Sequence, residues 1–316
     1  MRGAIIVNGV VKVGSLERGK LDLGFRIYDA LNLPSPLVIA RRMKGIGDMV
    51  SLLSAIRTLK TLRPEAKVIV WSKQPYVQIA QLSPDVDEAV TVQREGSLIP
   101  LDDPCPCGVY ESQVQRPLYA RPIIFCYAMG LPWLKLKPRF DLRRCAQELY
   151  AWREQLRNYP RPWIGVILRS AERWKDWPHA LKFAKLSSKR WSTFLIDARF
   201  RCKEQRVVSL NPPSVKSLVA LIALLDVLVT PDTGPLHIAE ALNVPTIALF
   251  GSMDASVRRI YDDSSVLYVQ GPCKFGREPC WYELCRPKYA FQPCMEAIKP
   301  KHVLELVSKL IAEEEA

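Results

Sequence analysis

Apolar and polar positions change their period along the first part of the chain. Residues 37–40 form a continuous apolar run, which predicts a short buried strand. Apolar side chains then recur at helical spacing and predict an amphipathic helix; they are Met49, Leu52, Leu53, Ile56 and Leu59. A second apolar run follows at 68–71. This order of strand, helix and strand predicts a parallel βαβ unit.

The same alternation restarts after a segment rich in proline and arginine at 158–162, which we interpret as a linker. Strands are predicted at 164–168, 193–196, 207–210, 227–229 and 246–250, and helices from Pro178, Ser214 and Pro235. Two such alternations predict an α/β protein with two Rossmann-like domains, 37–158 and 159–316, whose parallel sheets face a cleft.

Residues 1–36 are predicted to form an N-terminal hairpin extension. Two apolar runs, Ala4–Val7 and Val10–Val13, flank Asn8-Gly9. An Asn-Gly pair between β-branched runs is typical of a tight hairpin turn.

The most informative local pattern is the junction of a strand and a helix at 229–242. Thr233 suits the N-cap, Gly234 allows a ligand to approach the backbone, and Pro235 suits the first helical turn. The amide hydrogens of that turn and the positive end of the helix dipole favour an anion such as a diphosphate. His237 lies in the same turn and can add a hydrogen bond. An ordinary turn followed by a core histidine explains the local pattern equally well.

Four sequence blocks in order carry a family resemblance. Pro-Asp-Thr-Gly-Pro-Leu-His at 231–237 is followed by Val-Pro-Thr-Ile-Ala-Leu-Phe-Gly at 244–251. Gly47-Asp48 stands at the head of the first helix, Lys-Asp-Trp-Pro at 175–178, and Cys-Met-Glu-Ala-Ile-Lys-Pro at 294–300. Together they span the chain from about residue 37 to its last residue, and they resemble glycosyltransferase family 9, the ADP-heptose:lipopolysaccharide heptosyltransferases.

The resemblance implies the GT-B fold, with the acceptor bound by the first domain and the nucleotide sugar by the second. It implies an enzyme that transfers a heptose or related sugar with inversion and needs no catalytic metal. The implied donor is a nucleotide diphosphate sugar, with an ADP-sugar favoured. The implied acceptor is a hydroxyl of an anionic cell-envelope glycolipid such as the lipopolysaccharide core.

The matching positions also imply roles for single residues. Asp48 is expected to be the general base for the acceptor hydroxyl, although an aspartate at this place, judged without the family, is better explained as a helix cap. The expected donor-binding residues are Lys175, Asp232, Thr233, Gly234 and His237. An exposed lysine beside Trp177 is the alternative for Lys175.

The net charge of +13 and the pI near 9.4 favour anionic partners. Arg41, Arg42 and Lys44 are expected to bind an anionic acceptor group, or else to form a basic rim. The same charge leaves open transfer to protein or nucleic acid. A non-catalytic sugar-nucleotide-binding module is a further alternative, against which the retention of Asp48 argues.

The sequence around 1–13 lacks the unbroken apolar stretch of a secretory signal, and the longest apolar run, 218–229, includes Asp226. We therefore expect a cytoplasmic protein, with peripheral contact at the inner membrane allowed by its charge. Nine cysteines, an odd number, favour free thiols or metal ligands over a disulfide framework.

Four cysteines in one segment form a candidate tetrahedral site for a structural zinc or iron: Cys273, Cys280, Cys285 and Cys294. Buried inert thiols are the alternative.

Two features of the sequence leave the identity of the sugar and of the nucleotide open. Residues 169–173 replace the small-residue turn that is usual in the family, and Asp197 is only the nearest candidate for a ribose contact.

Overall fold

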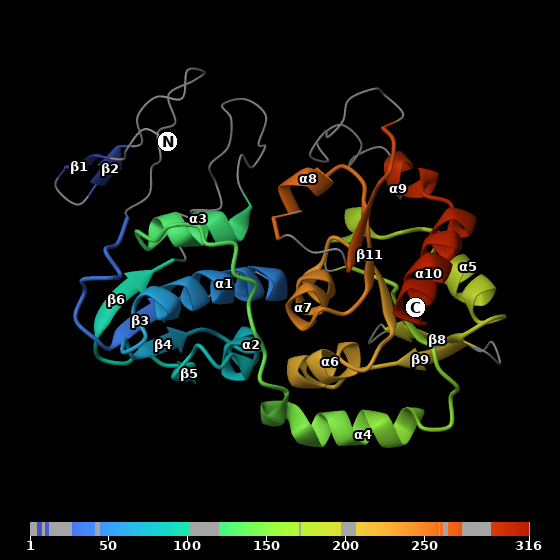
Figure 1. The fold of residues 1–316 in the computed structure, drawn as a ribbon, viewed down its shortest axis with the longest axis horizontal. Helices are drawn as coiled ribbons and strands as arrows, with labels where there is room; N and C mark the ends of the chain where they lie inside the picture. Colours follow the sequence, from blue (N-terminus) through green and yellow to red (C-terminus); the bar gives the residue numbers. More distant parts are fainter. Residues whose placement is uncertain are drawn as a thin grey trace. The chain divides into compact units, whose positions relative to one another are not determined.

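The computed structural model describes residues 5–7, 10–12, 27–41, 45–101, 120–170, 172–196, 207–258, 260–261, 265–273 and 292–315. The chain divides into two compact units, Met1–Phe140 and Asp141–Ala316 (Figure 1). Each unit contains its own parallel sheet with helices packed against it.

The first unit is built on a four-stranded sheet in the order β5-β4-β3-β6, with every pairing parallel. Its strands are β3 (Leu37–Ala40), β4 (Val68–Trp71), β5 (Glu88–Val90) and β6 (Ser97–Pro100), and its helices are α1 (Ile46–Leu62), α2 (Tyr76–Leu82) and α3 (Arg121–Ala128). The strand β3 is buried along its whole length, as is usual in parallel sheets. Two further strands, β1 (Ile5–Val7) and β2 (Val10–Lys12), pair antiparallel.

The second unit is built on a six-stranded parallel sheet in the order β12-β11-β10-β7-β8-β9. Its strands are β7 (Trp163–Ile167), β8 (Ser192–Ile196), β9 (Val207–Leu210), β10 (Val227–Pro231), β11 (Thr246–Phe250) and β12 (Val266–Gln270). Its helices are α4 (Ala146–Leu156), α5 (Ala180–Ser187), α6 (Val215–Ile222), α7 (Gly234–Leu242), α8 (Ala255–Arg258), α9 (Pro293–Ala297) and α10 (Pro300–Glu315), with 3-10 turns η2 (Leu142–Cys145) and η3 (Arg173–Lys175).

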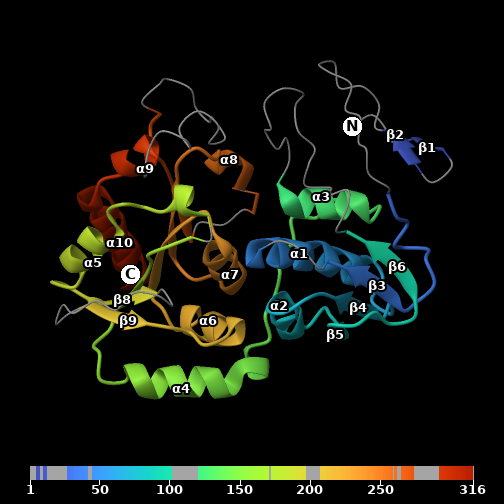
Figure 2. The same cartoon turned by 180° about the vertical axis from the view of Figure 1, so that it is seen from behind.

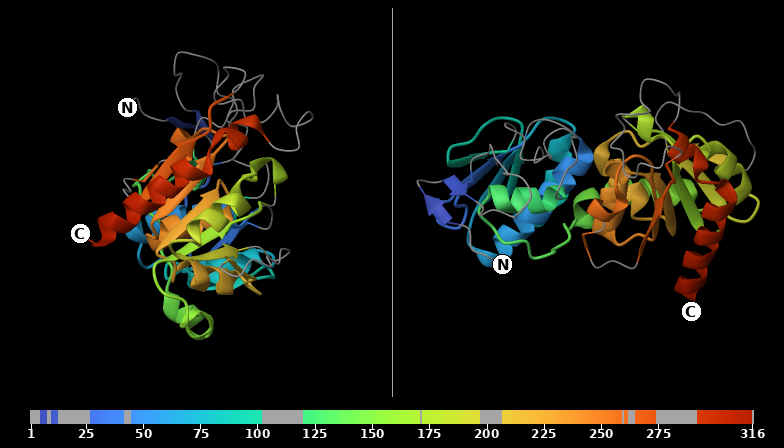
Figure 3. Two further views of the ribbon diagram at one scale, coloured as in Figure 1. Left: turned by 90° about the vertical axis from the view of Figure 1, so that its right-hand side faces the viewer. Right: turned by 90° about the horizontal axis from the view of Figure 1, so that it is seen from above.

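Helices cover both faces of the six-stranded sheet. On one face α5 and α10 pack together (Figure 3), and Val307 of α10 shares a core cluster with Ile247 of β11. On the other face α7 covers the sheet (Figure 2), and its Leu236 packs against Ala248, the next residue of β11. Successive strand residues point to opposite faces, so β11 contributes apolar side chains to both layers.

In each of the two parallel sheets, the strand order reverses at the strand that comes first in the sequence. In the second unit β7 lies between β8 and β10, and in the first unit β3 lies between β4 and β6. Ligands of open α/β sheets bind beyond the carboxyl ends of the strands at such a reversal. The residues expected to act in catalysis, acceptor binding and donor binding follow β3, β7 and β10 in the sequence.

Many of the predicted elements are confirmed. The strands expected at 37–40, 68–71, 207–210 and 246–250 have the same bounds in the structure. Ser214 caps α6, accepting a hydrogen bond from the Ser217 amide at 3.0 Å. The segment 158–162 lies in the second unit between α4 and β7, and Trp152 of α4 donates to the carbonyl of Ser217. Among the described helices, none combines the length and the apolar character of a membrane span.

Candidate active site

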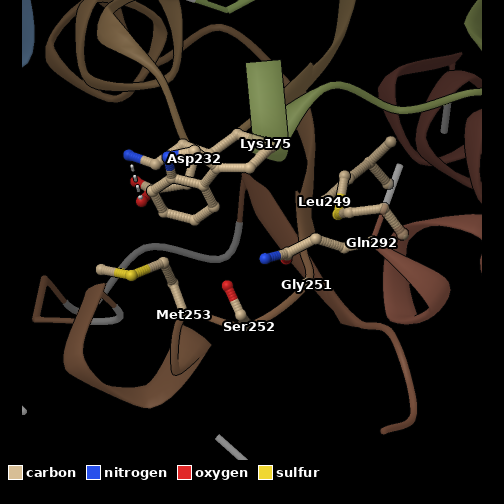
Figure 4. Close-up of a pocket in the computed structure, with 9 residues that line it drawn as sticks. Lys175, Asp232, Leu249, Gly251, Ser252, Met253 and Gln292 are labelled. Carbon is tan, nitrogen blue, oxygen red and sulfur yellow. Dashed lines mark ion pairs between the residues drawn. The ribbon is translucent and has the colours of Figure 1, made fainter. Parts of the chain in front are cut away.

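A buried carboxylate at the end of β10 holds three basic side chains of the second unit. Asp232 is only 4% exposed. One of its oxygens lies 3.4 Å from Lys175 Nζ (Figure 4). Arg258 Nε and His237 Nε2 lie 3.3 Å and 4.0 Å from the other oxygen. Lys175 ends the turn η3 after β7, Arg258 ends α8 after β11, and His237 lies near the start of α7. Segments far apart in the sequence therefore meet at the carboxyl ends of neighbouring strands.

The charge state of Asp232 follows from these neighbours. Burial alone would raise the pKa of Asp232, but the positive charges of Arg258, Lys175 and His237 lower it well below its usual range. The carboxylate is thus ionised near neutral pH. A buried anion would repel a diphosphate, so these contacts suit Asp232 to hold cations in place rather than to bind phosphate itself.

His237 is fixed on its other side by a second carboxylate. Its Nδ1 lies 3.2 Å from Oε2 of Glu240, which is 3% exposed, and the Tyr268 hydroxyl donates to Oε1 of Glu240 at 2.5 Å. The histidine therefore bridges two carboxylates, Glu240 and Asp232. This environment is polar, unlike that of a histidine packed in an apolar core.

Thr233 and Gly234 form the start of α7, with one difference from the expectation. Thr233 is the N-cap residue, but its side chain makes no capping hydrogen bond and instead donates to the carbonyl of Pro231 at 3.2 Å. Its hydroxyl therefore does not occupy the amide hydrogens of the first turn. Those amides and the positive helix end lie beside the cations held by Asp232, and this combination favours an anion.

A pocket adjoins this cluster within the second unit (Figure 4). Besides Lys175 and Asp232, its lining includes two buried polar residues, Ser252 and Gln292. The rest of the lining is largely apolar and comprises Trp174, Leu249, Gly251, Met253 and Met295.

In the first unit, Asp48 lies in the first turn of α1, beyond the carboxyl end of β3, and is 5% exposed. Its Oδ2 accepts a hydrogen bond from the Gly45 amide at 3.0 Å, so the residue does cap its helix. Two arginines pair with the same carboxylate: Arg121 at the start of α3, and Arg41, whose Nη2 lies 3.7 Å from Oδ2. Opposite charges stabilise the ionised form, which is the form that a general base requires.

Arg41 is itself buried, at 1% exposure. It donates to the carbonyl of Leu101 at 2.5 Å and its guanidinium lies 5.2 Å from the ring centroid of Phe125. These contacts attach Arg41 to the interior of the first unit beside Asp48. The other predicted acceptor residues, Arg42 and Lys44, lie outside the described residues.

Only two of the four cysteines predicted to bind a metal are among the described residues. Cys294 is buried and Cys273 is half-buried, whereas Cys280 and Cys285 lie outside the described residues, as does Asp197. Within the described ranges no group of three or more His, Cys, Asp or Glu side chains is arranged so that it could hold a metal ion.

The sequence model of glycosyltransferase family 9 (heptosyltransferase) matches residues 110–288, more than half of the chain. The chain belongs to glycosyltransferase family 9. The match includes the whole Asp232 cluster, from Lys175 to Tyr268.

Individual relatives share little sequence identity with this family 9 chain. Lipooligosaccharide heptosyltransferase 2 of Campylobacter jejuni is 29% identical over 100 residues, which cover 32% of this chain and 30% of that protein. The chain therefore matches less than a third of the length of such curated relatives. E. coli ADP-heptose lps heptosyltransferase II has a TM-score of 0.65 at 18% identity, covering 89% of this chain and 99% of that one.

A second similar structure is TibC of enterotoxigenic E. coli, an iron-containing dodecameric glycosyltransferase. It has a TM-score of 0.63 at 14% identity and covers 88% of this chain and 78% of that one. At these identities the likeness shows the fold. The predicted GT-B class, an α/β fold with two parallel sheets, is thereby confirmed.

Sequence reasoning missed several residues that this family 9 structure places in the two clusters: Arg121, Glu240, Ser252, Arg258, Tyr268 and Gln292. Glu240 lies three residues from His237 on the same helix, so helical spacing could have suggested their contact. The others contact the site across strands and helices, and no local spacing rule connects them to it.

Proposed function

We propose that this family 9 protein is an inverting glycosyltransferase that moves a heptose or related sugar from ADP-heptose, or a similar nucleotide diphosphate sugar, to a hydroxyl of a lipopolysaccharide-type glycolipid. The observation that carries the proposal is the set of three basic side chains around buried Asp232 at the start of α7. The donor and acceptor classes are supported by the names of the relatives, which refer to ADP-heptose, lipopolysaccharide and lipooligosaccharide.

In this proposal the second unit binds the donor diphosphate. Lys175, Arg258 and His237 face it, and Thr233 and Gly234 add a hydroxyl and a backbone amide. Negative charge on the diphosphate grows as its bond to the sugar breaks. Cations held at fixed positions by Asp232 therefore stabilise the transition state more than the bound donor, which is what accelerates the reaction.

The first unit supplies the base. Asp48 accepts the proton of the acceptor hydroxyl while the hydroxyl oxygen forms a bond to the anomeric carbon and the diphosphate leaves from the opposite side. A single displacement of this kind inverts the anomeric configuration. Arg121 and Arg41 fix the carboxylate, and Arg42 and Lys44 remain the predicted contacts to anionic groups of the acceptor.

An anionic acceptor in a membrane agrees with the net charge of +13. We propose that the protein works at the cytoplasmic side of the inner membrane through surface contact, because clustered basic residues are attracted to anionic lipid headgroups.

Incubation with ADP-heptose and a heptose-free lipopolysaccharide core glycolipid tests the proposal by mass spectrometry. We expect release of ADP and a glycolipid heavier by one heptose. Asp48→Asn should lower turnover by about 10²–10⁴-fold while ADP binding is kept. ADP binding without any product would indicate a non-catalytic module, and heptose found on protein or nucleic acid instead would replace the acceptor class.

A further inference from the structure

The pocket beside Asp232 contains two buried polar groups that the diphosphate site does not use. Ser252 lies just after β11 and Gln292 just before α9, and each is 3% exposed. Neither Ser252 Oγ nor Gln292 Nε2 has a hydrogen-bond partner among the described residues. Buried polar groups are almost always hydrogen-bonded, so two unpaired ones in a single pocket indicate a ligand that supplies the missing bonds.

The two groups point into the same space. Figure 4 shows the hydroxyl of Ser252 and the amide end of Gln292 directed toward the middle of the pocket, with Lys175 and Asp232 on another part of its wall. Oε1 of Gln292 lies 3.7 Å from Cys294 Sγ, which leaves Nε2 on the pocket side.

The chemistry of the lining indicates a neutral group with several hydroxyls. A further anion is disfavoured beside the ionised carboxylate of Asp232. A hydroxyl can accept a hydrogen bond from Gln292 Nε2 and can donate one to Ser252 or to Asp232. The apolar side chains of Trp174, Met253 and Leu249 suit the C–H faces of a sugar ring.

We propose that Ser252 and Gln292 bind hydroxyl groups of the sugar that is transferred and determine which sugar the enzyme accepts. This inference rests on the proposed function. A site built to hydrogen-bond a hydroxyl discriminates strongly against a ligand that lacks it, because the buried polar groups then stay unpaired. Ser252 and Gln292 would in this way select the sugar, while Lys175, Arg258 and His237 hold the diphosphate.

Calorimetric titration with ADP and with ADP-heptose separates the two parts of the site. In Ser252→Ala and in Gln292→Met the dissociation constant for ADP should stay within about twofold of the parent value. The constant for ADP-heptose should rise about tenfold in each variant, as expected for one lost hydrogen bond. Ser252→Ala should unfold at the parent temperature or above it, because it removes an unpaired buried group. Gln292→Met should unfold close to the parent temperature, because the only hydrogen bond it loses among the described residues is the weak one from Cys294 Sγ.

Gln270→Met is the matched control. Oε1 of Gln270 accepts from the Ala255 amide at 3.0 Å and its Nε2 donates to the Gly251 carbonyl, so this amide is already satisfied. The control should lose thermal stability and keep the parent ratio of the two dissociation constants. Equal affinity of the parent for ADP and ADP-heptose, unchanged ADP-heptose binding in both variants, or an equal loss for both ligands overturns the inference. A parent chain that binds neither ligand overturns the proposed function itself.

Discussion

Replacing Asp232 by asparagine removes one negative charge from the centre of the donor site and keeps the shape of the side chain. Lys175 and Arg258 would then stay close together without their shared counter-charge. Removing one partner of a buried charge pair costs about 3–5 kcal/mol. Because Lys175 and Arg258 are 16% and 12% exposed, we expect the lower limit, about 3 kcal/mol. For a unit of this size the melting temperature should fall by roughly 6–12 °C.

Thermal unfolding of the parent and Asp232→Asn measures this loss, followed on the transition of the second unit. Glu154→Gln is the control, since Glu154 pairs with Arg157 at 3.1 Å on the surface and such pairs contribute about 0.5 kcal/mol. An Asp232→Asn variant as stable as this control would refute the charge network.

The same pair of proteins tests the charge state of Asp232 through pH. The pKa of Asp232 is lower in the folded protein than in the unfolded chain. Its stabilising contribution is therefore complete above the unfolded value of about 4 and is lost as the pH falls through the folded value. The stability difference between parent and variant should shrink as the pH falls below about 4. A difference that stays the same down to about pH 2 would contradict the assignment.

Three further outcomes are expected from other parts of the structure. Tyr268→Phe removes a hydrogen bond to buried Glu240 and should cost about 1.5–3 kcal/mol in thermal unfolding. Tyr150→Phe, at a residue that is 67% exposed, should be neutral. Burial raises the pKa of Cys126 to about 12 and that of Cys145 to about 11. Neither thiol should therefore react with alkylating reagents near pH 8 in the folded protein, and rapid labelling of both would refute their burial. If the four C-terminal cysteines hold a structural metal, elemental analysis should find about one zinc or iron per chain, and Cys294→Ser should lose this metal. A parent protein that is stable without metal would assign these thiols to packing.

The sequence predicted the parts of the fold that depend on local pattern. Continuous apolar runs located strands such as β3 and β11, and the Ser214 cap located the start of α6. The helix α4 was not predicted; two of its residues, Trp152 and Leu156, are buried, too few to give a clear apolar stripe. Its place in the second unit depends on a contact between Trp152 and Ser217, which no local pattern encodes.

In the candidate site, too, only the residues that share a local pattern could be predicted. Asp232, Thr233, Gly234 and His237 are contiguous and could be identified as a block. Arg258 and Gln292 could not, because they meet Asp232 or its pocket only after the six-stranded sheet has formed. The burial of Arg41 was also invisible in the sequence, where a basic residue after a strand is more often solvent-exposed.

Calorimetric titration of ADP into the parent and into Lys175→Met tests the central claim most directly, with Lys182→Met, at an exposed lysine of α5, as control. We predict that the parent and the control bind ADP alike and that Lys175→Met binds it about 10–100-fold more weakly, as expected for the loss of one charge-assisted contact. A parent chain that binds neither ADP nor any other nucleoside diphosphate, or a Lys175→Met variant that binds ADP as well as the parent, would contradict a donor site around Asp232.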